Sequence, residues 1–283
     1  MVTALQLVDM GRLLDNIDAK AAQYQGAKPF PHIVIDDVLT QDAFKAAMAG
    51  FPGIDDQSWK GFIHVNEFKF SNPEPDTWDQ SLYDTAQEFC SPEFVSFLEQ
   101  LTGIQNLIPD FTMDGGGLHM TKRGGHLNIH ADFSTHHTHE DWARRVNILI
   151  YLNEEWPDEW GGKLELWDPE MTACQAKVTP QGNRMLVFTT SGDSFHGHPD
   201  GLTCPPDQAR RSLAMYYFTK EDAPVRRATN YRARPEDGGK RFAIAADRVA
   251  LDLYDRARRR LGISDDAVHR VLERFGRLRG KRK

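Results

Sequence analysis

The chain has 283 residues, of which 40% are hydrophobic, 27% charged and 10% aromatic. This composition is ordinary for one large globular domain or two small ones, and it excludes a disordered, collagenous or disulfide-rich chain. Lys and Arg together number 34 and Asp and Glu 41, which gives a net charge of −7. This acidic balance disfavours nucleic acid as the main partner, because proteins that bind nucleic acid are usually basic.

The three cysteines, Cys90, Cys174 and Cys204, lie far apart in the sequence. Neither a disulfide framework nor a zinc site built from cysteine is therefore expected. The N-terminus lacks the apolar stretch of a signal peptide, and no apolar run approaches the roughly 20 residues that a transmembrane helix needs. We expect a soluble, cytoplasmic protein with no membrane partner.

The first third of the sequence predicts helices and one early strand, at 32–36. Thr40 is expected to cap a helix, and the clearest helical signal covers 91–103. This segment begins with Ser91 as N-cap and Pro92 at the first helical position, and it ends at a glycine. Another apolar stripe at helical spacing comprises Trp78, Leu82, Ala86 and Phe89. We predict that residues 1–112 form a helical buttress, with one N-terminal strand, that packs on the rest.

From about residue 115 the hydrophobic pattern changes to a period of two, which is typical of strands. Leu127, Ile129 and Ala131 alternate with polar residues of the types that bind metals. Further strands are predicted at 146–152, 163–167, 185–189 and 212–218. Short strands at this spacing indicate a β-sandwich or barrel, so the fold class is α+β. Burying polar side chains inside a barrel costs free energy unless they bind a ligand.

After residue 218 the sequence becomes polar and then predicts two helices, over 242–261 and 264–275. The end of the chain is rich in Arg and Lys. We predict that 221–283 forms a polar linker, two C-terminal helices and a basic tail that is accessory to any chemistry.

A His and an Asp two residues apart on a strand share one face, where both can reach one metal ion. This spacing occurs three times, at 130–132, 139–141 and 198–200. The second pair follows Thr138, which favours a helix N-cap with acidic residues in its first turn. The third contains Pro199, which interrupts a strand. Only the first pair lies inside an alternating strand.

A second histidine is available downstream, as His196 or His198. Beyond it, strand alternation places one set of side chains on a common face: Arg210, Ser212, Ala214 and Tyr216. Arg211 would then point to the opposite face. A buried Arg on a face of otherwise small residues needs an anionic partner, which a ligand carboxylate would supply.

Together these segments resemble the prolyl 4-hydroxylase-type iron(II)/2-oxoglutarate dioxygenases. The matching segments, in chain order, are 124–133, 145–153, 161–167, 195–199 and 210–214. The segment 29–36 is also similar to the N-terminal strand of that family. The resemblance implies a double-stranded β-helix (jelly-roll) core over 113–220, flanked by N-terminal helices and a C-terminal helical extension.

The resemblance makes His130, Asp132 and His196 the iron ligands, with His198 as the alternative to His196. It makes Arg210 the partner of the distal carboxylate of 2-oxoglutarate, with Arg211 as its competitor. The cosubstrate would also be lined by Tyr151, Leu164 and Ser212. Members of the family often carry a Tyr upstream of the His-x-Asp pair, and here the nearest residues are His119 and Met120.

The implied activity is hydroxylation of an unactivated C–H bond with release of succinate and CO₂. Its cofactors would be Fe(II), 2-oxoglutarate and O₂, with ascorbate as a candidate reductant. The substrate could be a small molecule or an aminoacyl residue, prolyl among them. Residues 133–142 follow the metal pair directly and are either a lid or a solvated loop.

Two other functions fit parts of this pattern. A cupin-like zinc or manganese hydrolase or isomerase could use the same His/Asp/His set, but it gives no reason for Arg210 or Tyr151. A non-enzymatic binding module could use the basic C-terminal helix to recruit RNA or an acidic partner. A helix face rich in Lys and Arg is, however, more often simply solvated.

Overall fold

The structure is a computed structural model that describes residues 6–249. The predicted helix at 264–275 and the basic tail lie outside the described residues. Of the predicted helix at 242–261 only 242–249 is described, and it belongs to a helix seen at 240–249. No helix within 6–249 is both long and apolar enough to cross a membrane. The proposed division of the chain at 112 and 220 stays a prediction.

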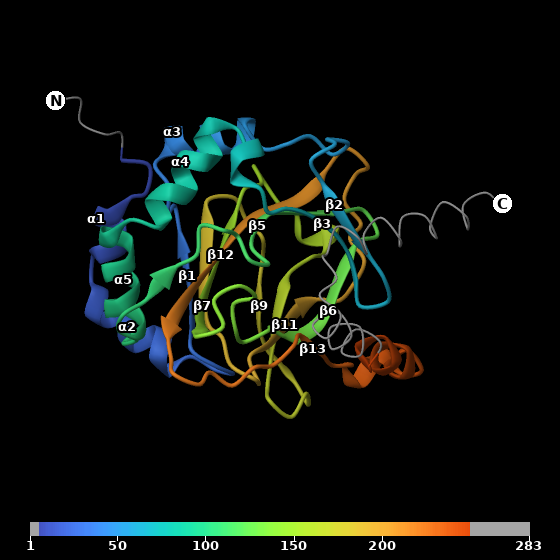
Figure 1. Cartoon of the computed structure of the whole chain (residues 1–283). Coiled ribbons are helices and arrows are strands. Elements are labelled where there is room, and N and C mark those ends of the chain that lie inside the picture. The colour runs from blue at the N-terminus through green and yellow to red at the C-terminus, as the bar shows by residue number, and fades with distance from the viewer. Residues whose placement is uncertain (1–5, 250–283) are drawn as a thin grey trace.

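Five helices in the N-terminal part cover one side of a strongly curved sheet (Figure 1). They are α1 (Met10–Leu14), α2 (Ile17–Gly26), α3 (Gln41–Ala49), α4 (Gln80–Phe89) and α5 (Pro92–Thr102). The strands are β1 (His32–Asp36), β2 (Lys60–Ile63), β3 (Glu67–Asn72), β4 (Ile108–Pro109), β5 (Gly117–Lys122), β6 (His126–Ala131), β7 (Trp142–Tyr151), β8 (Leu164–Trp167), β9 (Cys174–Val178), β10 (Arg184–Thr189), β11 (Phe195–His198), β12 (Ala209–Lys220) and β13 (Asn230–Tyr231).

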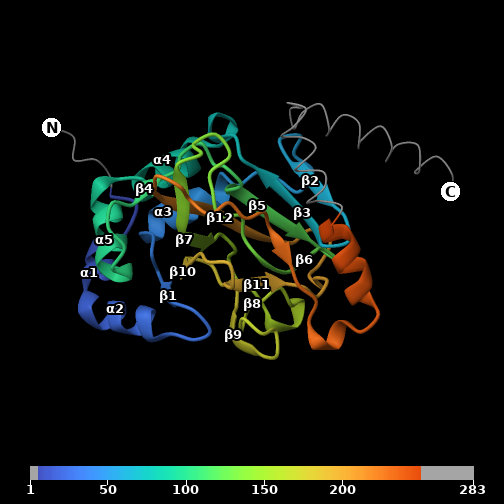
Figure 2. The ribbon, with the colours of Figure 1, turned by 60° about the horizontal axis from the view of Figure 1, so that its bottom comes forward.

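Within the described residues the strands form one 13-stranded sheet in the order β1-β10-β7-β12-β5-β3-β6-β11-β8-β9, with β2, β4 and β13 attached at its sides. Neighbouring strands pair antiparallel, as in β10 with β7 and β11 with β6. The sheet curls into a nearly closed barrel, which is the predicted jelly-roll or double-stranded β-helix (Figure 2). The α+β fold class is thus confirmed.

The local signals of α5 produce the helix that the sequence predicts. The Ser91 hydroxyl accepts a hydrogen bond from the Phe94 amide at 3.2 Å, Pro92 starts the helix, and Gly103 ends it at a φ of +75°. This is the usual arrangement of an N-cap and a glycine at the C-terminal end. Thr40 caps α3 in the same way, because its hydroxyl accepts from the Ala43 amide at 3.4 Å.

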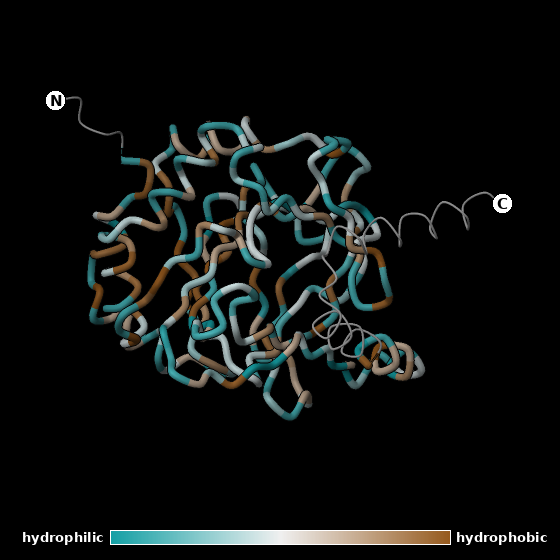
Figure 3. The backbone as a smooth tube through the Cα atoms, in the orientation of Figure 1, coloured by the Kyte–Doolittle hydropathy of each residue, from teal (hydrophilic) through white to brown (hydrophobic). Residues whose placement is uncertain are grey.

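The main hydrophobic core lies between these helices and the outer face of β7, β10 and β12. Strand alternation sends one set of side chains outward into this core: Val146, Ile148, Ile150, Leu213, Met215 and Tyr217. They meet the inward face of α5, and the Tyr217 hydroxyl donates a hydrogen bond to the Phe89 carbonyl at 2.8 Å. Figure 3 shows the hydrophobic stretches where helices and sheet meet. The opposite faces of the same strands are left to line the barrel interior.

The prediction of a helix starting at Thr138 is wrong. The chain instead forms a loop that enters β7 at Trp142, which pairs with Lys220 of β12. The ring of His139 stacks on Trp142 at a centroid distance of 4.2 Å. Strand pairing and aromatic packing therefore override the local capping signal, because tertiary contacts outweigh propensity.

Of the two alternatives for 133–142, a lid or a solvated loop, the solvated loop does not describe His136, which is buried against Trp142 and Phe218. Its Nε2 lies 3.6 Å from Asp110 Oδ1. His137 remains exposed but contacts Asp114, with 2.7 Å between Nδ1 and Oδ1. These contacts hold the loop against the chain before β5.

The Phe94→Ala variant is expected to lower the free energy of unfolding by about 3 to 5 kcal/mol, because it empties a fully buried site in α5. Urea denaturation followed by circular dichroism measures this loss. The exposed Gln100 of the same helix provides the control, since Gln100→Ala should change stability by less than about 0.5 kcal/mol. Equal losses in both variants would contradict the packing described for α5.

Candidate metal and cosubstrate site

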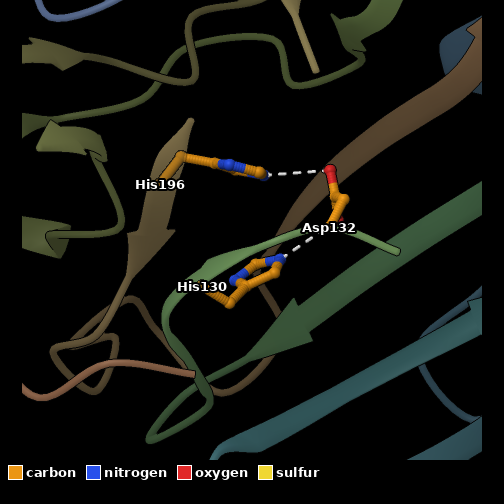
Figure 4. A group of neighbouring side chains, drawn as sticks. All are labelled: His130, Asp132 and His196. Carbon is orange, nitrogen blue, oxygen red and sulfur yellow. Dashed lines mark ion pairs between the residues drawn. The ribbon is translucent and has the colours of Figure 1, made fainter. Parts of the chain in front are cut away.

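Two histidines and an aspartate converge inside the barrel (Figure 4). His130 of β6 lies directly opposite His196 of β11 in the antiparallel register, and Asp132 follows the end of β6. Their candidate ligand atoms all lie within 4.8 Å of one another. The Nε2 of His130 is 3.4 Å from Asp132 Oδ1, and the Nε2 of His196 is 3.6 Å from Asp132 Oδ2.

Backbone carbonyls set the orientation of both imidazole rings. The Nδ1 of His130 lies 2.9 Å from the Asn128 carbonyl, and the Nδ1 of His196 lies 2.9 Å from the Ser194 carbonyl. A carbonyl oxygen only accepts, so each Nδ1 carries the proton and donates it. Each Nε2 is then left with a lone pair aimed at the carboxylate, which is the tautomer of a metal-binding histidine.

The protonation states agree with this arrangement. Burial lowers the pKa of His196 to about 4, so its ring is neutral at pH 7. Burial alone would raise the pKa of Asp132, but the positive charge of Arg144 opposes this effect, and the pKa lies well below its usual range. The site thus presents two imidazole nitrogens and a carboxylate, a donor set that fits a divalent transition metal.

Two side chains of β7 hold Asp132 in place. The Asn147 amide donates to Oδ2 at 2.7 Å, and the Arg144 guanidinium donates to the same oxygen at 3.2 Å. Arg144 also donates to the Asn147 side-chain carbonyl at 2.8 Å, which in turn accepts from Thr190 at 3.1 Å. These bonds leave Oδ1 of Asp132 free of hydrogen bonds from β7.

Sequence reasoning missed both partners of Asp132. Arg144 comes soon after Thr138, where a helix N-cap is wrongly expected. Its buried guanidinium lies over the ring of Tyr216, with 3.3 Å between Cζ and the ring centroid. Asn147 did leave a signal, because it is a polar residue inside the otherwise apolar strand 146–152. An amide in such a strand must face a polar interior, and here it does.

A buried arginine lies elsewhere on the interior wall. Arg210 of β12 donates from Nε to the Gly162 carbonyl at 3.0 Å and from Nη2 to the Tyr151 hydroxyl at 3.1 Å. Burial lowers its pKa, and no carboxylate among residues 6–249 forms an ion pair with it. Ser212 is buried opposite Tyr151 in the β12–β7 register, and Leu164 packs in the same apolar cluster as Tyr151. The structure therefore brings the predicted cosubstrate residues together.

The two alternative residues, His198 for the metal and Arg211 for the cosubstrate, lie outside these groups. His198 is buried but does not belong to the converging group within the described residues, and its Nδ1 has no hydrogen-bond partner there. Burial and the nearby charge of Arg210 hold the pKa of His198 well below its usual range. Arg211 points to the opposite face of β12, with its guanidinium 5.5 Å from the Phe51 ring.

The position upstream of the His-x-Asp pair is taken by a histidine. His119 lies opposite Ser212 in the β5–β12 register, so it shares the interior face, whereas Met120 pairs with Arg211. Burial, with Lys69 and Arg210 nearby, lowers the pKa of His119 to about 3. A neutral imidazole therefore stands where the family often has a Tyr.

A polar cluster that the sequence did not predict borders the histidines. Tyr231 of β13 lies opposite His130, with 5.5 Å between their ring centroids. Glu67 of β3 contacts His64 Nε2 at 2.9 Å and Lys69 Nζ at 3.1 Å. Burial would raise the pKa of Glu67, but Lys69 and His64 together keep it below its usual range. In the sequence, this strand is indicated by an alternation of charged and aromatic residues: Glu67, Phe68, Lys69 and Phe70.

Comparison with known proteins agrees with this geometry. Residues 116–218 match the family model of the 2OG-Fe(II) oxygenase superfamily. The fold is similar to a prolyl-4-hydroxylase of Pseudomonas putida, with a TM-score of 0.50, 17% identity, and coverage of 71% of this chain and 99% of that one. It is also similar to a Trichoplax adhaerens prolyl hydroxylase in complex with a hypoxia inducible factor peptide, with a TM-score of 0.53, 15% identity, and coverage of 74% and 92%.

A search of curated proteins finds no match to this sequence. The family match and the fold nevertheless agree: residues 116–218 carry a domain of the 2OG-Fe(II) oxygenase superfamily, and the fold is similar to that of the prolyl hydroxylases above. Enzymes of this family use Fe(II), 2-oxoglutarate and O₂.

Replacing His196 by Ala is expected to abolish binding of Fe(II), because the site would lose one of its two convergent nitrogens. The matched change, His198→Ala, should leave the metal bound. Anaerobic titration calorimetry of the purified variants measures both affinities. Loss of binding in His198→Ala with retention in His196→Ala would reverse the choice between the two histidines.

Asn147→Ala should weaken metal binding about 10- to 100-fold, since Asp132 loses its shortest hydrogen bond. Asn153→Ala serves as control, because Asn153 is also a buried, hydrogen-bonded asparagine but contacts Pro180 and Arg211 instead. Both variants are expected to lose stability, and only the first to lose metal affinity. Equal metal affinities would show that Asn147 does not position the carboxylate.

Proposed function

We propose that the protein hydroxylates an unactivated C–H bond of a small molecule or an aminoacyl residue, with His130, Asp132 and His196 holding Fe(II). The observation that carries this proposal is the pairing of two features in one interior. Three convergent acceptor atoms lack a donor between them, and the buried Arg210 lacks a carboxylate partner among the described residues.

The donor set supports iron rather than a structural metal. Two histidines and one carboxylate on one face of the ion leave open positions for other ligands. When bound, Fe(II) with 2-oxoglutarate and O₂ supplies the oxidation that inserts one oxygen atom into the C–H bond, while the other enters succinate as CO₂ leaves. The task of the chain is to hold these groups and the substrate together and to keep the interior dry.

Arg210 and Tyr151 are suited to the distal carboxylate of 2-oxoglutarate. Arg210 Nη2 donates to the Tyr151 oxygen, so the Tyr151 proton remains free to point elsewhere. Burial raises the pKa of Tyr151, which keeps the phenol protonated. A guanidinium and a phenol proton side by side would form charge-assisted hydrogen bonds to one carboxylate. Ser212 and Leu164 complete this proposed cosubstrate site.

The substrate is proposed only as a broad class, an aminoacyl residue or a small molecule. The Trichoplax adhaerens relative in fold binds a peptide fragment, which supports an aminoacyl residue, prolyl among the candidates. A free small molecule is the alternative substrate class. The cupin-like hydrolase or isomerase remains the competing function because it would use the same three ligands, but it leaves Arg210 without a task.

Succinate should form from 2-oxoglutarate when the protein is incubated with Fe(II) and ascorbate in air, and detection by mass spectrometry checks this. Arg210→Gln should raise KM for 2-oxoglutarate at least about tenfold, because it removes a charge-assisted hydrogen bond. Arg211→Gln, on the opposite face of β12, should leave KM unchanged. Absence of succinate from the unaltered protein would favour the hydrolase or isomerase.

A further inference from the structure

A cavity of about 460 Å³ opens beside Asp132. This volume is within the usual range of small-molecule sites, about 300 to 1,000 Å³. One wall is the end of β6, and the other is the chain from 226 to 230 together with the helix at 240–249. Figure 1 shows β13 beside β6, with which it pairs, and the late helix close to both. Arg210 and Tyr151 are not part of its lining, so the cavity is distinct from the cosubstrate site.

The charges on the cavity wall are unbalanced. Three arginines, Arg226, Arg227 and Arg248, face one carboxylate, Asp132, which Arg144 and Asn147 already engage. Arg226 pairs with Glu140 outside the cavity, with 2.6 Å between Nη2 and Oε2.

Arg227 and Arg248 form no ion pair with any carboxylate in the described part of the chain. Among the residues that the structure describes, Arg248 donates to the neutral side-chain carbonyl of Asn230, at 3.2 Å. Within residues 6–249, two guanidinium groups thus contribute positive charge to one cavity without a paired carboxylate, and such charge attracts anions.

The position of Arg227 is built into the fold. Its amide donates to the Ser134 hydroxyl at 2.8 Å, and its carbonyl accepts from the Ser134 amide at 3.0 Å. Ser134 lies two residues after Asp132, so these bonds tie Arg227 to the candidate metal site. Gly192 makes room for the guanidinium, because a Cβ atom there would lie 2.9 Å from Nη1.

We propose that Arg227 and Arg248 bind an anionic group, a carboxylate or a phosphate, on the molecule that is hydroxylated. The identification of that molecule as the substrate rests on the proposed function, whereas the anion site itself does not. A guanidinium offers a pair of N–H donors that match the oxygens of either anion. With the anion held by these two residues, the rest of the molecule extends past Asp132 toward the metal.

The test uses the full-length protein loaded anaerobically with Fe(II) and saturated with 2-oxoglutarate, so that Arg210 is already occupied. Phenyl phosphate, phenylacetate and the neutral benzyl alcohol are titrated by calorimetry. We expect at least one anion to bind while benzyl alcohol does not, and the tighter of the two identifies the group as phosphate or carboxylate. Equal binding of benzyl alcohol, or no binding of either anion, would overturn the proposal.

Arg227→Gln and Arg248→Gln should each weaken anion binding about tenfold, the usual effect of losing a hydrogen bond to a charged group. Arg241→Gln is the matched control, since Arg241 is an exposed arginine of the same helix that does not line the cavity. Unchanged affinity in both test variants, or an equal loss in the control, would contradict the assignment.

Succinate formation separates this proposal from the proposed function. Anion binding that depends on Arg227 and Arg248 in a protein that never converts 2-oxoglutarate would overturn the oxygenase function and support the anion site. Conversion of 2-oxoglutarate without such binding would support the function and overturn the anion site.

Discussion

The two imidazole nitrogens and the carboxylate oxygens at the centre of the barrel are all acceptors, and acceptors cannot satisfy one another. Their convergence is unfavourable unless a cation joins them, so the surrounding structure has to hold them together. The β6–β11 register brings His130 opposite His196, backbone carbonyls orient both rings, and Arg144 restrains Asp132. The rest of the interior is arranged around this one constraint.

Packing of the outer helices on the barrel stabilises the fold and so offsets the free-energy cost of the polar interior. β7 and β12 present Val146 and Met215 on their outer faces, where they pack against α5 and its neighbours. Because the hydrophobic core lies on the outside of the barrel, the inner faces of the same strands are free to carry Asn147 and Arg210. The polar side chains thus lie on the inner face of the barrel, and the apolar side chains whose burial stabilises the fold lie on its outer face.

Arginines lie at two separate positions around the candidate metal site. Arg210 lies on the inner wall, where it would meet the distal carboxylate of the cosubstrate. Arg227 and Arg248 lie at the cavity beside Asp132, where they would meet an anionic substrate. Two separate anion sites would allow the proposed cosubstrate and substrate to be bound at once without competing for one arginine.

Local sequence patterns determined the α5 helix with its Ser91 cap, the alternating strands, and the His130, Asp132 and Arg210 pattern, because each depends on residues near in sequence. They failed at Thr138, where pairing of β7 with β12 replaced the expected helix. Only the tertiary structure separated His196 from His198 and brought Arg144 to Asp132. It also returned the chain after β12 to the barrel, placing Arg227 beside the site. These outcomes depend on strand register and on contacts between distant segments, which no local periodicity encodes.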